Sequence, residues 1–256
     1  MERIFVFLRS PGAATTVLLG ATIIALIVAN SPLATQYMSL VNLPLGPLTA
    51  MEWVNDALMA IFFLFVGLEV KRELVSGELN TNAKRIMPGI AALFGVIVPA
   101  IIFYLIAGSN DVYVHGWAIP TATDIAFAIG VITALGSRVP NSMKVFLTAL
   151  AVIDDLIAII VIAIFYAASI NLFYLVASVI VTGLLIYCNR TGYVRSLSYI
   201  ILGVILWYCI LRSGLHATMA GVILAMTIPE RGKIGKKYVR PMQHWEHYLS
   251  NWVSFV

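Results

Sequence analysis

Three acidic residues lie within stretches of sequence that are otherwise apolar. Asp154 and Asp155 stand side by side in front of a ten-residue apolar run that ends at Phe165, and Asp124 follows the segment Ile119-Pro-Thr-Ala-Thr123. A carboxylate inside a membrane is costly, so acids in such places usually mark ion pathways or proton relays. Carboxylate oxygens suit a hard cation such as sodium or lithium better than a soft transition metal. Ion handling is therefore the first hypothesis.

The two neighbouring aspartates cannot share one face of a helix, because adjacent helical residues point about 100° apart. At three- and four-residue steps Asp155 is aligned with the small or hydroxyl residues Thr148, Ala151 and Ala158. Such residues permit close approach of another helix. Asp154 is aligned instead with a bulky stripe formed by Leu147, Leu150, Ile157 and Val161. We therefore expect Asp155 to be the main ion ligand and Asp154 to face outward, towards a cation on another helix. A pair that is buried and satisfied only by hydrogen bonds is the alternative.

Asp124 is expected at a break in a membrane helix. Pro120 lacks an amide hydrogen and biases Ile119 away from helical geometry, so the span near 116–135 should be discontinuous. Thr121 or Thr123 could cap the following half-helix, with Asp124 in its first turn. Transporters build ion sites at such breaks. The alternative is that Asp124 serves only to stabilise the start of the half-helix.

A site of this kind can exchange ions. Burial and mutual repulsion raise the pKa values of carboxyl groups in general, which brings protonation towards physiological pH. A proton and a sodium ion can then compete for the same oxygens, so the site holds one or the other. This competition is the minimum requirement for an exchanger.

The composition indicates the elements that must position these acids. The 256 residues are 61% hydrophobic and only 11% charged, too few charges for the surface of a soluble domain of this size. Apolar runs recur near the roughly 20 residues that cross a bilayer, and they lack the alternation of barrel strands. We predict an all-α, polytopic transmembrane bundle forming a single membrane domain, with spans near 12–30, 53–70, 86–107, 116–135, 144–167, 172–188, 196–211 and 213–228 and a ninth beginning near Trp245.

The basic residues predict the orientation. With a cytoplasmic N-terminus, 15 of the 16 lysine and arginine residues fall on the inner side, and only Arg212 lies outside. Such a bias sets topology by the positive-inside rule. The net charge of +4 is thus explained by membrane-facing loops, with the lipid bilayer as partner and no need for nucleic acid.

Two further segments carry expectations. The outer connection Ser31–Met51 could form a small hairpin, although its prolines weaken that prediction. The chain stops a few apolar residues into its ninth span, which would leave backbone groups unsatisfied in lipid. We therefore expect a fragment of a longer protein, with a short interfacial helix as the alternative.

Several motifs together resemble the NhaA-type sodium/proton antiporter family over essentially the whole chain. They are Val54-Asn-Asp-Ala-Leu-Met-Ala60, Phe65-Val-Gly-Leu-Glu-Val-Lys-Arg-Glu-Leu74, Gly116-Trp-Ala-Ile-Pro-Thr-Ala-Thr-Asp-Ile-Ala-Phe-Ala128, Ala151-Val-Ile-Asp-Asp155 and Ser213-Gly-Leu-His-Ala-Thr218. The resemblance implies a bacterial inner-membrane antiporter, not an enzyme, that exports sodium or lithium in exchange for protons without a cofactor. It also implies one half of an inverted-repeat fold, a kind of architecture for which this family is a standard example.

The resemblance also implies roles for single residues. Asp155 matches the family's ion-binding aspartate, Asp154 its neighbour, and Thr123 and Asp124 the helix break. A cytoplasmic-side cluster linked to pH regulation is matched by Glu69, Arg72, Glu73 and Glu246, although a solvated helix end would explain these charges equally well. His216 matches a histidine of the family, for which packing and hydrogen bonding are the favoured role, and the role of Asp56 stays open. A homodimer through the outer loop also stays open.

Departures from the family pattern limit the prediction. The family's second broken helix and the buried lysine expected to pair with Asp154 would lie beyond Val256, so this chain alone is expected not to exchange ions. Two other classes compete with the antiporter. An intramembrane aspartyl protease needs its two acids on separate helices, which the doublet does not provide, and a symporter or channel could use the same carboxylates.

Overall fold

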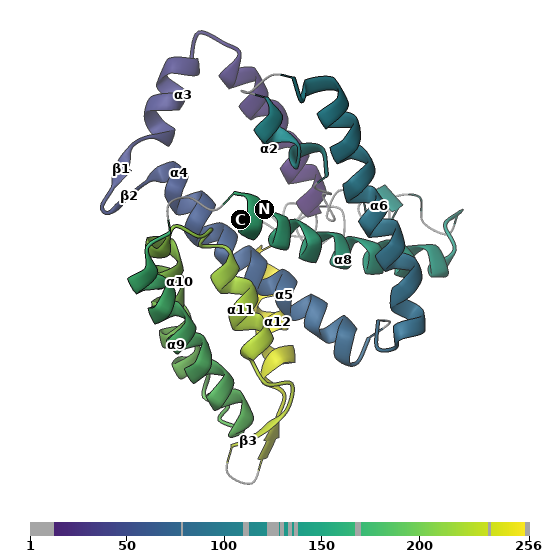
Figure 1. Cartoon of the computed structure of the whole chain (residues 1–256), viewed down its shortest axis with the longest axis vertical. Coiled ribbons are helices and arrows are strands. Elements are labelled where there is room, and N and C mark those ends of the chain that lie inside the picture. Colours follow the sequence, from purple (N-terminus) through teal and green to yellow (C-terminus); the bar gives the residue numbers. More distant parts are fainter. Residues whose placement is uncertain are drawn as a thin grey trace, which may run out of the picture. The chain divides into compact units, whose positions relative to one another are not determined.

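The structure, a computed structural model, describes residues 13–77, 79–109, 113–121, 128, 131–132, 135, 138–166, 170–234 and 237–253. The α-helices are α2 (Ala13–Ala29), α3 (Ala34–Val41), α4 (Ala50–Glu52), α5 (Met59–Val75), α6 (Asn82–Ala107), α8 (Asn141–Phe165), α9 (Leu172–Arg190), α10 (Ser196–Ser213), α11 (Met219–Thr227) and α12 (Pro241–Val253). A π-helix, η1 (Trp53–Leu58), and two 3₁₀ turns, η2 (Val114–Gly116) and η3 (Ile119–Thr121), lie among them. Two short hairpins pair β1 (Pro44–Leu45) with β2 (Leu48–Thr49) and β3 (Gly232–Ile234) with β4 (Lys237–Val239). The described part is thus almost entirely helical (Figure 1).

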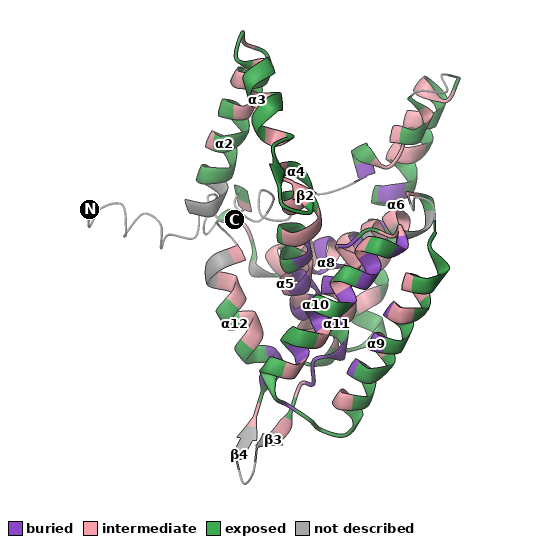
Figure 2. Ribbon diagram, turned by 90° about the vertical axis from the view of Figure 1, so that its left-hand side faces the viewer, coloured by how far each residue is buried: buried purple, intermediate pink, exposed green. Residues whose placement is uncertain are grey.

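The chain divides into two compact units. The first contains Met1–Gly67, Asn171–Ser213 and Ala217–Val256, and the second contains Leu68–Ile170 and Gly214–His216. Figure 2 shows buried residues along α10 and α11 of the first unit and along α8 of the second. Each unit therefore has an interior of its own.

The predicted outer hairpin is present at the start of the first unit. Pro44 pairs with Thr49 and Leu45 with Leu48 across a two-residue turn. Gly46 occupies that turn with a φ of 78°, a conformation that glycine adopts without steric cost. The next helix begins with a capping box, in which Glu52 accepts from the backbone N–H of Thr49 at 2.7 Å and the Thr49 hydroxyl accepts from the N–H of Glu52 at 3.3 Å. The hairpin thus leads directly into a firmly started membrane helix.

The helix then passes through a π-helical stretch that hydropathy does not reveal. The amide of Met59 donates to the carbonyl of Val54, five residues earlier, at the end of η1. Trp207 on α10 stacks on Trp53 with ring centroids 6.2 Å apart, and its indole N–H donates to the Asp56 carbonyl at 2.7 Å. Stretches of π-helix are rare and frequent at functional sites. Here η1 receives a side-chain donor from a helix about 150 residues away in sequence.

Small residues allow the helices of the first unit to pack closely. A Cβ atom at Gly221 on α11 would overlap the Ala60 carbonyl and lie 2.7 Å from the Leu64 nitrogen, and one at Gly67 would lie 2.7 Å from the Ala225 Cβ. In Figure 1, α9, α10 and α11 lie side by side. The side-chain amide of Asn189 ties α9 to α11 by donating to the Thr227 carbonyl at 2.6 Å. These approaches are of the small-residue kind that membrane helices use.

The second unit is built on the packing of α6 against α8. Its most buried apolar side chains are Leu68, Val70, Leu79, Ala92, Ala151 and Val152. Pro88 and Pro99 lie within α6, where a neighbouring helix can support the interrupted hydrogen bonding. The face of α8 that carries Ala151 and Asp154 therefore contributes directly to this core.

Five helical stretches of the described chain are long and apolar enough to cross a membrane, namely Ala50–Val75, Asn82–Ala107, Ser142–Ile162, Leu172–Arg190 and Ser196–Ser213. Thr16–Ala29 and Ala34–Val41 together qualify as a sixth, bent by 117°. A polytopic helical protein is confirmed. Residues 213–228 were predicted as one membrane span, but they do not form one continuous helix. Here α10 ends at Ser213, Gly214 follows with a φ of 86°, and α11 has only nine residues. A left-handed glycine after the last turn is a common helix stop.

Candidate functional site

The aspartate doublet lies in the middle of α8, a continuous helix of 25 residues. Ala149, Ala151 and Val152, in the two turns before the doublet, are buried in the second unit. The Thr148 hydroxyl donates to the Lys144 carbonyl at 3.0 Å, which satisfies this polar group within its own helix. The doublet is therefore presented on a rigid helix next to small, buried residues.

The two carboxylates differ in burial in the sense opposite to the prediction. Asp154, expected to face outward, is only 3% exposed and is the more buried of the pair, whereas Asp155 is half-buried. The helical step fixes only the angle between the two side chains. Buried Ala151 precedes Asp154 by three residues and Asp155 by four, so helical spacing alone does not decide which of the two is the more buried. The pair thus combines one buried carboxylate with one that is half-buried.

The approach to the predicted helix break is anchored to the end of α8. The Tyr166 hydroxyl donates to the His115 carbonyl at 2.6 Å and accepts from the Ala118 amide at 3.4 Å. Trp117 packs edge-to-face on Phe165 with ring centroids 5.2 Å apart. The two 3₁₀ turns around Pro120 agree with an interrupted helix, but Thr123 and Asp124 lie outside the described residues. Their place beside the doublet stays a prediction.

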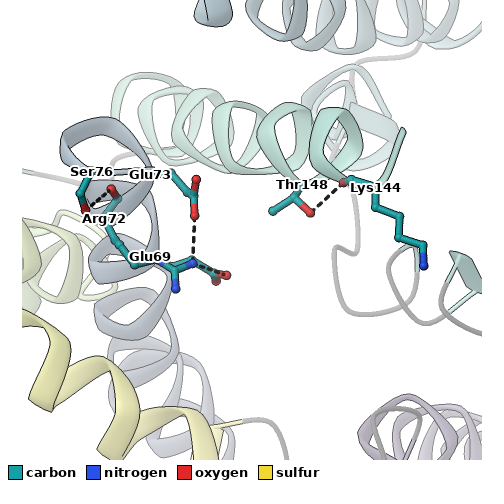
Figure 3. A network of polar contacts seen from close by, with 6 residues as sticks. All are labelled: Glu69, Arg72, Glu73, Ser76, Lys144 and Thr148. Atoms are coloured by element: carbon teal, nitrogen blue, oxygen red, sulfur yellow. Dashed lines mark hydrogen bonds and ion pairs between the residues drawn. The ribbon is translucent and has the colours of Figure 1, made fainter. Parts of the chain in front are cut away.

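A charge cluster formed by Glu69, Arg72 and Glu73 lies near the end of α5 (Figure 3). One Arg72 terminal nitrogen is 2.9 Å from Glu73 Oε1 and 3.8 Å from Glu69 Oε1. The side chains of Arg72, Glu69 and Glu73 are 37%, 31% and 15% exposed, so Glu73 is the innermost. The cation between two acids makes this a paired network, which goes beyond a row of independently solvated charges.

The backbone at the end of α5 supports this cluster. The amides of Gly77 and Leu79 donate to the carbonyls of Arg72 and Glu73 at 3.0 and 3.1 Å. A Cβ atom at Gly77 would collide with the Glu73 side chain, so a glycine is needed where the chain turns back beneath that carboxylate. The Lys144 side chain on α8 extends away from the cluster in Figure 3.

The remaining predicted site residues belong to other elements. Glu246 is half-buried on α12 of the first unit, so its membership of the charge cluster stays a prediction. His216 is exposed in the turn before α11, which does not match the packed histidine that we expected. Asp56 lies half-buried in η1, where its backbone carbonyl accepts from Trp207. Neither Tyr166 nor Trp207 was singled out from the sequence, because their partners are main-chain carbonyls that no motif reveals.

Comparison with known proteins decides the family. A family model described as Na+/H+ antiporter 1 matches residues 6–256. The chain belongs to this family. A Mesorhizobium japonicum protein named Na(+)/H(+) antiporter NhaA is 52% identical over 252 residues, which cover 97% of this chain and 63% of the relative. Proteins of the same name from Brucella ovis and Rhizobium etli are 50% and 46% identical over 98% of this chain.

The family membership confirms the resemblance and excludes one alternative class. The relatives are named as transporters, so an intramembrane protease is not supported. The chain spans 63–65% of the length of these curated relatives. The shared part includes the aspartate doublet and the charge cluster, both of which fall within the matched residues.

Proposed function

We propose that this protein takes part in exchanging sodium or lithium for protons across a bacterial inner membrane, with the N-terminus in the cytoplasm. The observation that carries the proposal is the pair on α8, with Asp154 buried and Asp155 half-buried next to it, in a chain of an antiporter family. Buried acids in membrane helices are rare and usually belong to a transport path. The proposal also includes control of internal sodium and pH.

In this mechanism Asp155 holds either the cation or the proton. A half-buried carboxylate can be reached by an ion that has lost part of its water, and its oxygens are hard ligands suited to sodium or lithium. Asp154 lies deeper and adds negative charge that favours the cation when no proton is present. Because both ions need the same oxygens, the site carries one cargo in each direction. Thr123 and Asp124 are proposed to complete the site from the helix break.

The proposal further holds that residues 1–256 are not sufficient for exchange. It is supported by the length of the relatives, of which this chain covers 63–65%. A homodimer through the β1–β2 hairpin stays an open part of the proposal, and the exposure of Pro44 and Leu45 in β1 is compatible with it.

The function is tested in everted membrane vesicles from a host that lacks sodium/proton antiporters. The chain is assayed alone and fused to the remaining C-terminal part of the Mesorhizobium japonicum relative. We expect added sodium to dissipate a preformed pH gradient only with the fusion. Exchange by residues 1–256 alone would refute the insufficiency, and a sodium effect with the sign of a symporter would refute antiport itself.

We further propose that the Glu69–Arg72–Glu73 cluster sets the pH dependence of exchange. Arg72→Gln removes the cation that lies 2.9 Å from Glu73 and 3.8 Å from Glu69, and it leaves two like charges on neighbouring turns. Because the charge balance of the cluster is changed, we expect the pH profile of exchange to shift by about one pH unit, with maximal exchange kept within about twofold.

Arg72→Lys is the matched control, since it keeps the positive charge and should retain the parent profile. Sodium-driven exchange measured from pH 6 to pH 9 in the fusion decides the outcome. An unchanged profile in Arg72→Gln would show that the cluster is only a structural helix end.

A further inference from the structure

A shallow groove runs along the first three turns of α6 in the second unit. It has a volume of about 390 Å³ and is lined by Asn82, Arg85, Ile86, Gly89, Ile90 and Leu93. Ile86, Ile90 and Leu93 expose about half of their side-chain surface. At Gly89 an added Cβ atom would meet nothing within 4 Å, so the missing side chain opens the middle of the groove. The groove is apolar along its length and has its charge at one end.

That charge belongs to Arg85, whose guanidinium is held in place by the end of α5, by the connection to α6 and by the first residue of α6. Its Nε–H donates to the Leu79 carbonyl, one terminal nitrogen donates to the Leu74 carbonyl at 2.9 Å, and the other lies 3.5 Å from Asn82 Oδ1. These contacts use three of the five N–H donors of an arginine. The guanidinium is thus fixed at the end of the groove with donors to spare.

The length of α6 places this end at the membrane surface. Its 26 residues extend about 39 Å, whereas the hydrocarbon core of a bilayer is about 30 Å thick. Because charged groups avoid the hydrocarbon core, we place the first turn, with Arg85 and the exposed Lys84, in the headgroup region and the apolar residues from Ile86 to Leu93 at the depth of the acyl chains. The first turn contains no acidic residue that would repel an anion.

We propose that this groove binds an anionic phospholipid. The phosphate interacts with Arg85, with the exposed Lys84 as the neighbouring residue in the same turn, and one acyl chain lies over Gly89 between Ile86, Ile90 and Leu93. The order of charge and apolar surface along the groove matches the order of phosphate and hydrocarbon in a lipid. Two cations in one turn favour an anionic lipid over a zwitterionic one, in agreement with the attraction of basic juxtamembrane residues to anionic leaflets. The proposal does not depend on ion exchange.

Native mass spectrometry of the purified, delipidated chain tests the proposal. The protein is titrated with phosphatidylglycerol and, separately, with phosphatidylcholine of the same acyl chains. We expect the first phosphatidylglycerol to bind at least about tenfold more tightly, as two charge contacts at the membrane surface would provide. Equal binding of the two lipids would overturn the assignment of an anionic headgroup.

A matched pair of variants tests the place of binding. Gly89→Leu fills the groove, whereas Gly95→Leu adds the same side chain to the same helix outside it, at a position that is equally open. Gly89→Leu should weaken phosphatidylglycerol binding about tenfold, the change expected when roughly two methylene groups lose their contacts. Gly95→Leu should bind as the parent does. The same loss in both variants, or in neither, would overturn the groove as the site.

A measurement without substitutions covers the case in which a variant does not fold. Phosphatidylglycerol with a photoreactive group in one acyl chain is cross-linked to the parent protein, and the labelled peptides are mapped. We expect labelling concentrated on residues 86–93. Labelling spread evenly over the exposed apolar helices, including α9, would show only bulk lipid and would refute the proposal.

Discussion

Replacing Asp155 with asparagine is expected to abolish sodium-dependent proton exchange, with a loss of at least about 100-fold. The amide is nearly isosteric, but it carries no negative charge and does not take up a proton in the transport range. Even groups that only support a metal ligand are worth 10–100-fold in affinity, so a direct ligand should be worth no less. The measurement is dissipation of a pH gradient by sodium or lithium in everted vesicles, with the fused chain described above.

A second readout separates ion binding from transport. A ligand that binds the folded state raises its thermal midpoint, so sodium should stabilise the parent protein in detergent and should not stabilise Asp155→Asn. Glu52→Gln is the matched control. It makes the same carboxylate-to-amide change at an exposed capping box, where glutamine can replace glutamate. Retained exchange in Asp155→Asn, with normal stabilisation by sodium, would remove Asp155 from the mechanism.

Replacing Gly221 with alanine is expected to destabilise the first unit strongly. A Cβ atom there would overlap the carbonyl oxygen of Ala60 and come within 2.7 Å of the Leu64 nitrogen. Both are backbone atoms of α5, so no side chain can rotate to relieve the clash and the two helices must separate. Overpacking of this kind costs about 1–3 kcal/mol. We expect the midpoint of thermal unfolding in detergent to fall by about 5 °C.

Gly183→Ala provides the matched control for this prediction. Gly183 is also helical, on α9, and an added Cβ atom meets nothing within 4 Å. Both substitutions gain the same helix propensity, about 1 kcal/mol, so the difference between them reports the clash alone. An unchanged midpoint for Gly221→Ala would mean that α5 and α11 do not approach each other as closely as described.

The position of Gly221 shows that a sequence motif does not reveal which residues make close contacts between helices. The motif Ser213-Gly-Leu-His-Ala-Thr218 drew attention to His216, yet the structure exposes that histidine and places the close helix contact three residues after the motif. A glycine in an apolar run has the same appearance whether it meets a neighbouring backbone or open space. Gly221 and Gly183 differ only in what lies opposite them, which is a property of the fold.

The hairpins and the π-helix also show how far local sequence predicts structure. The outer hairpin was only a weak prediction, because the prolines of that segment argue against strands. The β3–β4 hairpin in the basic loop and the π-helix η1 were not foreseen. A π-helix depends on hydrogen-bond partners such as Trp207, and these reach the site from distant parts of the chain.

By itself the sequence determined that this is a polytopic helical membrane protein of the sodium/proton antiporter family with two adjacent acids in one membrane helix. These conclusions rest on hydrophobic run length, on the one-sided placement of basic residues and on specific motifs. All three are properties of the sequence that can be recognised without knowing any tertiary contact. Only the tertiary structure decided that Asp154 is buried while Asp155 stays half-buried, and that Glu73 is the innermost member of its cluster. The helical repeat fixes the angle between two side chains, but the segments packed against them decide which one leaves solvent.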